Sequence, residues 1–121
     1  MPTVSFPAIT PRERYKLLCA TIMPRPIALV TTADAAGTVN AAPFSFFNVF
    51  SEEPPLVVLG LQHKPAGERK DTTRNIAETG VFCINLVDEA IAEAMNICAI
   101  DFPPGESEVA AAGLTLLPGI D

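Results

Sequence analysis

Two extended segments joined by a short polar turn constrain the fold more than any other feature of this chain. Residues 27–32 are apolar up to a pair of threonines, and residues 38–45 return with small residues, a proline and a serine. The turn Asp34-Ala35-Ala36-Gly37 has the acidic residue and the glycine that favour a tight reversal, so we expect an antiparallel hairpin. The first strand lacks strict alternation. This predicts burial on both faces, as in a barrel strand packed under a helix.

Length and composition limit the class of protein. A chain of 121 residues has the size of one domain, so we expect a single domain over residues 1–121. The apolar fraction is 49% and the charged fraction only 18%, which indicates either a deep core or an apolar surface covered by a partner chain. The net charge of −6 and the lack of a basic cluster beyond Arg69-Lys70 argue against a nucleic-acid or anionic-membrane partner.

Cysteine usage and targeting signals predict a cytoplasmic protein. Cys19, Cys83 and Cys98 lie in apolar segments without metal-ligand spacing, which indicates reduced, buried thiols. Residues 1–11 lack the charged and apolar regions of a secretory signal. No apolar run approaches the ~20 residues that a membrane span requires. We therefore expect no contact with a membrane.

Capping and breaking signals predict the other elements. Thr10-Pro11-Arg12-Glu13 combines a capping box with a proline at the first helical position, so a helix should begin there and end before Pro24. Asp71 should cap a helix that runs to Thr79 and ends at Gly80, and Asp88 should cap another. The remaining expectations are loops at 51–55 and 62–70, strands at 56–61 and 81–87, a short helix at 107–113 and a nascent strand at 114–117.

Familiar catalytic patterns are absent from the sequence. His63 is the only histidine, and no nucleophile turn accompanies it. Clustered metal ligands and glycine-rich nucleotide loops are missing too. A lone histidine in a polar loop is more often a solvated side chain than a functional one. We expect neither a catalytic side chain nor a metal site.

Residues 69–75 form a candidate anion site. Lys70 supplies a positive charge, Arg74 a fork of donors, and Thr72 and Thr73 hydroxyls beside the free amides of a helix N-terminus. The alternative is that Asp71 only caps the helix while the basic side chains stay solvated.

Polar side chains at the ends of the hairpin strands would suit a planar cofactor that carries a phosphate. Thr31, Thr32, Asn40 and Ser45 lie there, and Asn40 and Asn48 can each donate and accept, as the pyrimidine edge of a flavin requires. The three phenylalanines at 44, 46 and 47 would serve either as core or dimer contacts, or in stacking.

Four short motifs follow one another along the chain, at residues 25–32, 40–47, 54–56 and 70–76, and an apolar strand with an asparagine follows at 80–87. In this order, over roughly residues 21–118, they resemble the flavin-reductase-like, FMN-binding split-barrel family. The resemblance implies an α+β fold, mainly β with helices, in which a split β-barrel homodimer holds FMN near the subunit interface. Members of this family are usually longer, so the chain is expected to lack the C-terminal strands that help to close the barrel.

The resemblance also implies an activity and a set of site residues. Members of the family commonly reduce flavin with NADH or NADPH, and some supply reduced flavin to a partner monooxygenase. The positions that would line the isoalloxazine ring and ribityl chain, partly through backbone, are Thr31, Thr32, Asn40, Ala42, Pro43 and Ser45. Lys70, Asp71 and Thr72 would lie near the phosphate, with Arg25 as a further candidate.

Three functions remain open at this level. The first is an NAD(P)H:flavin oxidoreductase, in which the cofactor supplies the chemistry and no side chain acts as acid or base. The second is a flavin-binding module without turnover. The third is a dimerising structural fragment without a ligand.

Overall fold

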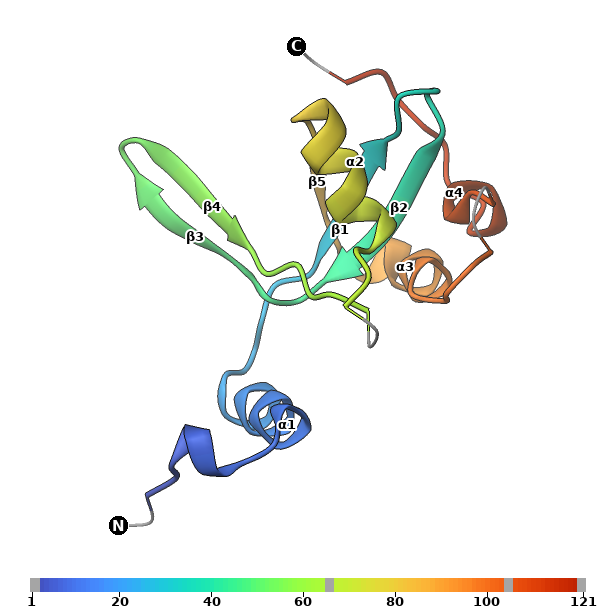
Figure 1. The fold of residues 1–121 in the computed structure, drawn as a ribbon. Helices are drawn as coiled ribbons and strands as arrows, with labels where there is room; N and C mark the ends of the chain where they lie inside the picture. Colours follow the sequence, from blue (N-terminus) through green and yellow to red (C-terminus); the bar gives the residue numbers. More distant parts are fainter. Residues whose placement is uncertain (1–2, 65–66, 104–105, 120–121) are drawn as a thin grey trace.

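Two antiparallel sheets organise the chain (Figure 1). The computed structural model describes residues 3–64, 67–103 and 106–119. The first sheet has the order β2-β1-β5, and the second pairs β3 with β4. The strands are β1 (Ala28–Ala33), β2 (Val39–Phe44), β3 (Phe47–Glu52), β4 (Pro55–Leu59) and β5 (Cys83–Leu86). The helices are η1 (Phe6–Ala8), α1 (Pro11–Thr21), α2 (Asp71–Thr79), η2 (Glu89–Ile91), α3 (Ala92–Cys98) and α4 (Glu108–Ala111).

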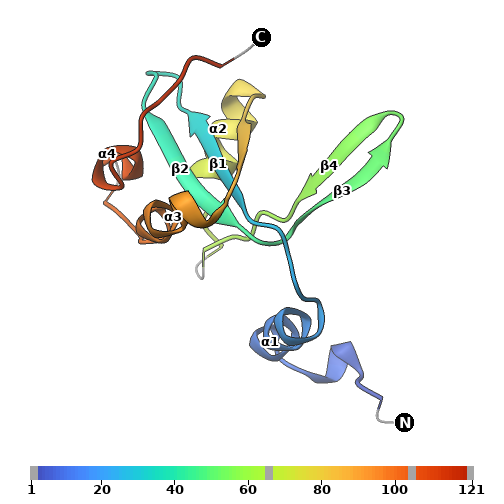
Figure 2. The ribbon, with the colours of Figure 1, turned by 180° about the vertical axis from the view of Figure 1, so that it is seen from behind.

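The central strand β1 is covered on both faces, as its sequence predicts. Leu29 packs with Cys98 of α3 and Val109 of α4, whereas Val30 belongs to a second cluster with Phe44. Side chains alternate along a strand, so these neighbours point to opposite faces. Helix α2 therefore lies on one side of the sheet, and α3 and α4 lie on the other (Figure 2).

The turn between β1 and β2 forms as expected. The Asp34 carboxylate accepts hydrogen bonds from the amides of Ala36 at 2.9 Å and Thr38 at 2.8 Å. Gly37 adopts a φ of 85°, which costs little only for glycine. The hydrogen bonds from the Thr38 and Ala36 amides hold the pKa of the Asp34 carboxyl below its ordinary value, because they stabilise the charged form.

Helix α1 begins with the predicted capping box. The Thr10 hydroxyl accepts from the Glu13 amide at 3.3 Å, and the Glu13 carboxylate accepts from the Thr10 amide at 2.7 Å. The helix ends at Thr21, before Pro24. It lies away from both sheets in the two ribbon views.

The expected loop at 51–55 is wrong. Residues 47–52 form the strand β3, which pairs with β4, so only residues 53 and 54 remain between the two strands. Val49 and Phe50 of β3 are 67% and 76% exposed. Burial on one face of this strand is therefore too weak to give a clear alternating pattern.

The capping role expected of Asp71 is also wrong. The N-cap of α2 is Lys70, without a side-chain bond, and Asp71 is the first helical residue. The C-terminal prediction is confirmed, because Gly80 adopts a φ of 73° and donates its amide to the Ile76 carbonyl at 2.9 Å.

The last third of the chain matches its predictions only in part. Asp88 caps as expected, accepting from the Ala90 and Ile91 amides, but the first turn after it is the 3₁₀ helix η2. The strand expected at 81–87 is limited to β5, the helix expected at 107–113 to α4, and residues 114–117 form no strand.

Two further observations concern the cysteines and the helices. All three cysteines are free, but only Cys98 is buried and Cys83 is exposed, so the expectation of buried thiols is wrong for Cys83. Among the described residues, no helix has both the length and the apolar character needed to cross a membrane.

Candidate functional site

A cavity of about 120 Å³ opens where the outer strand β2 meets the first turn of α2 and the segment after α3. A second cavity of about 150 Å³ adjoins it and shares Pro43, Phe44 and Lys70 with it. Together the two cavities form one hollow beside β2, which we call the candidate site. The first cavity is lined by Asn40, Ala42, Pro43, Phe44, Lys64, Lys70, Asp71, Thr72, Cys98, Ala99, Ile100, Asp101, Phe102 and Glu108. The second adds Tyr15, Ser45, Phe46, Gly60 and Gln62.

Most of the residues predicted for cofactor binding line the candidate site. They are Asn40, Ala42, Pro43, Ser45, Lys70, Asp71 and Thr72. Three lie elsewhere. Thr32 is buried beneath α2, Thr31 lines a separate cavity with Leu116 on the opposite face of β1, and Arg25 lies near the base of the β3–β4 hairpin.

Two lysines give the candidate site positive charge. Lys70 lies with its Nζ atom 5.9 Å from the centre of the Phe44 ring, and Lys64 lines the same cavity. The sequence predicts a polar loop at Lys64 and no role for its side chain. A single lysine six positions before Lys70 gives no signal that a tertiary fold will bring the two together.

The first turn of α2 adds backbone donors. Within the described ranges, the amides of residues 71–73 have no acceptor, because the first intrahelical bond is donated by the Arg74 amide to the Lys70 carbonyl. Such amides and the helix dipole favour an anion at this end of a helix.

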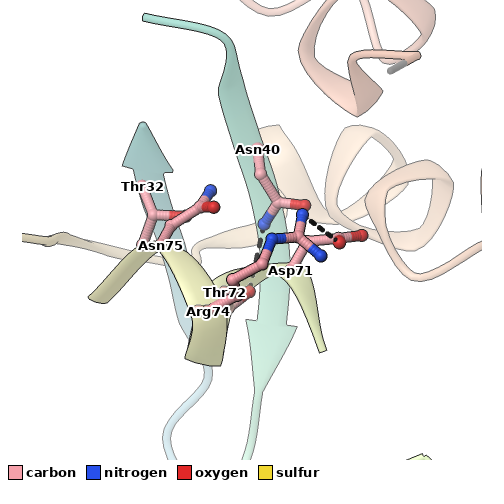
Figure 3. A network of polar contacts seen from close by, with 6 residues as sticks. All are labelled: Thr32, Asn40, Asp71, Thr72, Arg74 and Asn75. Carbon is pink, nitrogen blue, oxygen red and sulfur yellow. Dashed lines mark hydrogen bonds and ion pairs between the residues drawn. The ribbon is translucent and has the colours of Figure 1, made fainter. Parts of the chain in front are cut away.

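Carboxylates oppose this positive charge, but two of them have partners. Asp71 forms an ion pair with Arg74 at 2.6 Å (Figure 3), and Glu108 accepts a hydrogen bond from the Ala41 amide at 3.2 Å. Asp101 is the third carboxylate of the lining. Arg74 therefore neutralises Asp71 and does not line the candidate site itself.

Two amide–hydroxyl hydrogen bonds join α2 to the sheet (Figure 3). Asn40 of β2 donates from Nδ2 to the Thr72 hydroxyl at 3.0 Å, and Asn75 of α2 donates to the Thr32 hydroxyl at 3.1 Å. Asn75 is the last residue of the segment 69–75 predicted as a candidate anion site, but the sequence assigned it no role of its own. Its signal in the sequence is only an asparagine inside a predicted helix.

Arg25 and Asn48 do not line the candidate site, although Arg25 borders it through a hydrogen bond of 3.5 Å from Nε to the Ser45 hydroxyl. The Arg25 guanidinium donates to the carbonyls of Cys19 at 3.1 Å and Ile22 at 2.6 Å, and it lies 5.7 Å from the centre of the Phe46 ring. Asn48 and Arg25 line a largely apolar groove of about 320 Å³ between α1 and the hairpin. The two asparagines expected at one flavin edge therefore do not meet.

The thiol of Cys98, at the wall of the candidate site, is suited to packing. Burial raises its pKa, and the nearby Glu108 carboxylate raises it further. A protonated thiol is a poor nucleophile, so this side chain offers no reactive group at neutral pH.

Comparison with known proteins gives a consistent result. The family model described as a flavin reductase like domain matches residues 20–121. An uncharacterized protein of Halalkalibacterium halodurans is 51% identical over 92% of this chain and 53% of its own length. The chain spans about half the length of the curated relatives it matches.

Solved structures with the same fold agree. Nitrilotriacetate monooxygenase component B from Bacillus cereus is 42% identical, with a TM-score of 0.92 over 99% of this chain and 59% of that chain. A protein of Shewanella frigidimarina, described as a flavin reductase with a split barrel domain, is 27% identical, with a TM-score of 0.78 over 95% of this chain and 56% of that one. The predicted α+β split-barrel fold is confirmed.

Proposed function

The chain belongs to the flavin-reductase-like family, and from this we propose that it is an FMN-binding flavoprotein that acts as an NAD(P)H:flavin oxidoreductase. One observation supports the proposal above all. Two lysines and the first two residues of α2, Asp71 and Thr72, line a hollow together with Asn40 and Ala42 of β2, and the amides of these helix residues have no acceptor among the described residues. We also propose that residues 1–121 form a single flavin-reductase-like domain.

The phosphate would lie at the α2 end of the candidate site. Lys64 and Lys70 would supply charge, and the amides of residues 71–73 would supply directed donors. Asp71 opposes an anion less than its charge suggests, because Arg74 pairs with it. A hydrogen bond to a charged group contributes about 1.5–3 kcal/mol, and partial exposure of Lys70 places its share at the lower end.

The flavin ring would lie along β2 toward the second cavity. Ala42 and Pro43 leave the main chain approachable, and Ser45 with the rings of Phe44 and Phe46 continues the same wall. These groups fit a planar heterocycle that needs both apolar contact and a few polar partners.

When bound, FMN would supply the redox chemistry by accepting a hydride from NADH or NADPH. The residues of the chain would bind and orient the two rings, which is the contribution expected where no side chain must move a proton. Similarity to a monooxygenase component suggests that a partner monooxygenase consumes the reduced flavin.

We further propose a homodimer in the cytoplasm. The hairpin β3–β4 exposes Val49, Phe50 and Val58, and a second subunit would cover them. Three free cysteines agree with a reducing compartment.

The proposal is tested by FMN titration and by NADH and NADPH oxidation with purified protein. We expect Lys70→Ala to weaken FMN binding about tenfold while riboflavin binding changes less than about twofold. Arg69→Ala, an exposed neighbour, is the matched control and should change neither affinity. Equal losses of affinity for FMN and riboflavin would show that Lys70 does not contact the phosphate.

Two other results would select the alternatives. FMN that binds without any NAD(P)H oxidation would indicate a non-catalytic flavin-binding module. Folded protein that stays colourless, with a melting temperature unchanged by added FMN, would indicate a structural fragment, because binding to the native state must raise that temperature.

A further inference from the structure

Three buried polar side chains lie between α2 and the sheet it covers (Figure 3). Thr72 is 1% exposed, Asn75 2% and Thr32 3%. Burying polar groups in this way is unfavourable unless they are paired, so their hydrogen bonds determine how α2 is seated.

The two hydrogen bonds of this layer have the same chemistry but reach different strands. Asn40 of β2 donates to Thr72 at 3.0 Å, and Asn75 donates to Thr32 of β1 at 3.1 Å. Residues 72 and 75 are three apart, so they lie on the same face of the helix. One bond therefore fixes the first turn of α2, and the other fixes the following turn.

Only one of the two bonds borders the candidate site. Asn40 and Thr72 both line the cavity that Lys70 lines, whereas Asn75 and Thr32 lie outside the candidate site. One of the two Nδ2 hydrogens of Asn40 is donated to the Thr72 hydroxyl. The second hydrogen and the Oδ1 atom remain able to contact a ligand, so the test must separate a direct contact from a positioning role.

We propose that Asn40 is a positioning residue that sets the preference for phosphorylated over unphosphorylated flavin. Through Thr72 it holds the first turn of α2, and with it Lys70 and the amides of residues 71–73, against β2. This inference rests on the proposed function. Loss of the bond lets these donors move relative to the strand that would support the ring, and hydrogen bonds to a phosphate weaken as they lengthen and lose alignment.

The experiment compares Asn40→Ala with Asn75→Ala in the full chain, which is the same substitution at the two equivalent bonds. Dissociation constants for FMN and riboflavin are measured by flavin fluorescence, together with the melting temperature. We expect Asn40→Ala to weaken FMN about fivefold to twentyfold and riboflavin less than about twofold. Asn75→Ala should lower the melting temperature at least as much and leave the ratio of the two constants unchanged.

Thr72 provides a second test from the other end of the same hydrogen bond. Thr72→Val should reproduce the loss of FMN preference, because it keeps the shape and removes the acceptor. Thr72→Ser should restore the preference, because its hydroxyl can still accept from Asn40.

Each other outcome overturns the inference. Equal losses of FMN and riboflavin in Asn40→Ala would mean that Asn40 contacts the ring. A matching loss of preference in Asn75→Ala would mean that overall stability, not the first turn, is responsible. Unaltered FMN preference in Asn40→Ala overturns this role alone, whereas wild-type protein that binds neither flavin overturns the proposed function as well.

Discussion

Glu108 stabilises the outer edge of the three-stranded sheet, and replacing it should destabilise the fold by a predictable amount. Its carboxylate accepts a hydrogen bond at 3.2 Å from the amide of Ala41, a residue with no exposed surface. The neighbouring Ser107 hydroxyl donates to the Val39 carbonyl at 2.9 Å. The start of α4 thus occupies part of the edge of β2 that lacks a partner strand.

The magnitude follows from what each substitution leaves behind. Glu108→Ala leaves the buried Ala41 amide without an acceptor, which costs about 1–3 kcal/mol of stability. The bond is long, so we expect a value in the lower half of that range. Glu108→Gln keeps a carbonyl acceptor and loses only the charge, so about 1 kcal/mol or less should be lost. For a chain of this size, 1 kcal/mol lowers the melting temperature by about 4 °C.

The assay is urea unfolding followed by circular dichroism, with thermal melting as a second measure. The midpoint should fall in the order wild type, Glu108→Gln, Glu108→Ala, with an unchanged slope. Glu106→Ala, an exposed residue of the same segment, serves as the control. If Glu108→Ala is as stable as wild type, or Glu108→Gln is as damaging as Glu108→Ala, the edge bond is not what stabilises β2.

Two further substitutions test the geometry of the turns. Gly60→Ala would place a Cβ atom 2.8 Å from the Cβ atom of Phe46, and thermal melting should show a loss of stability of about 1–3 kcal/mol. Gly119→Ala is the control, because a Cβ atom there meets nothing within 4 Å. Equal stability of the two variants would contradict the close approach at Gly60. Asp34→Asn removes a carboxyl whose pKa is lowered in the folded protein. The contribution of this carboxylate to the free energy of unfolding is therefore present above its ordinary pKa and is lost as the pH falls through its pKa in the folded state. The melting temperatures of wild type and Asp34→Asn should therefore converge below about pH 4, and a constant difference between neutral and strongly acidic pH would argue against this role.

The features predicted correctly from the sequence depend on residues close together in the chain. The capping box of Thr10 and Glu13, the turn at Asp34 and the left-handed Gly80 are each completed within four residues. Local hydrogen bonding determines such features almost independently of the surrounding fold.

The features that were missed depend on contacts between distant segments. The cap at Asp71 is the exception, because its ion pair with Arg74 is local and the N-cap is Lys70, only one residue earlier. The role of Asn75 depends on Thr32, 43 positions away, and that of Lys64 on a cavity built from four parts of the chain. No pattern within a short window of sequence records such pairs.

The candidate site was predictable in its main elements but not in its composition. The strand residues Ala42 and Pro43 and the helix start at Lys70 do share one hollow. Neither Thr31 nor Thr32 lines it, because both belong to the central strand β1, whereas the hollow opens beside the outer strand β2. The hairpin sequence does not indicate which of its two strands lies at the edge of the sheet.

One six-residue strand supplies side chains to both hydrophobic clusters, since Leu29 belongs to one and Val30 to the other. Neither cluster can be lost without removing side chains of that strand from the other, so we expect the two clusters to unfold together in a single cooperative transition. Substitutions on opposite sides of β1 are thereby coupled through the backbone they share, and their effects on stability need not add.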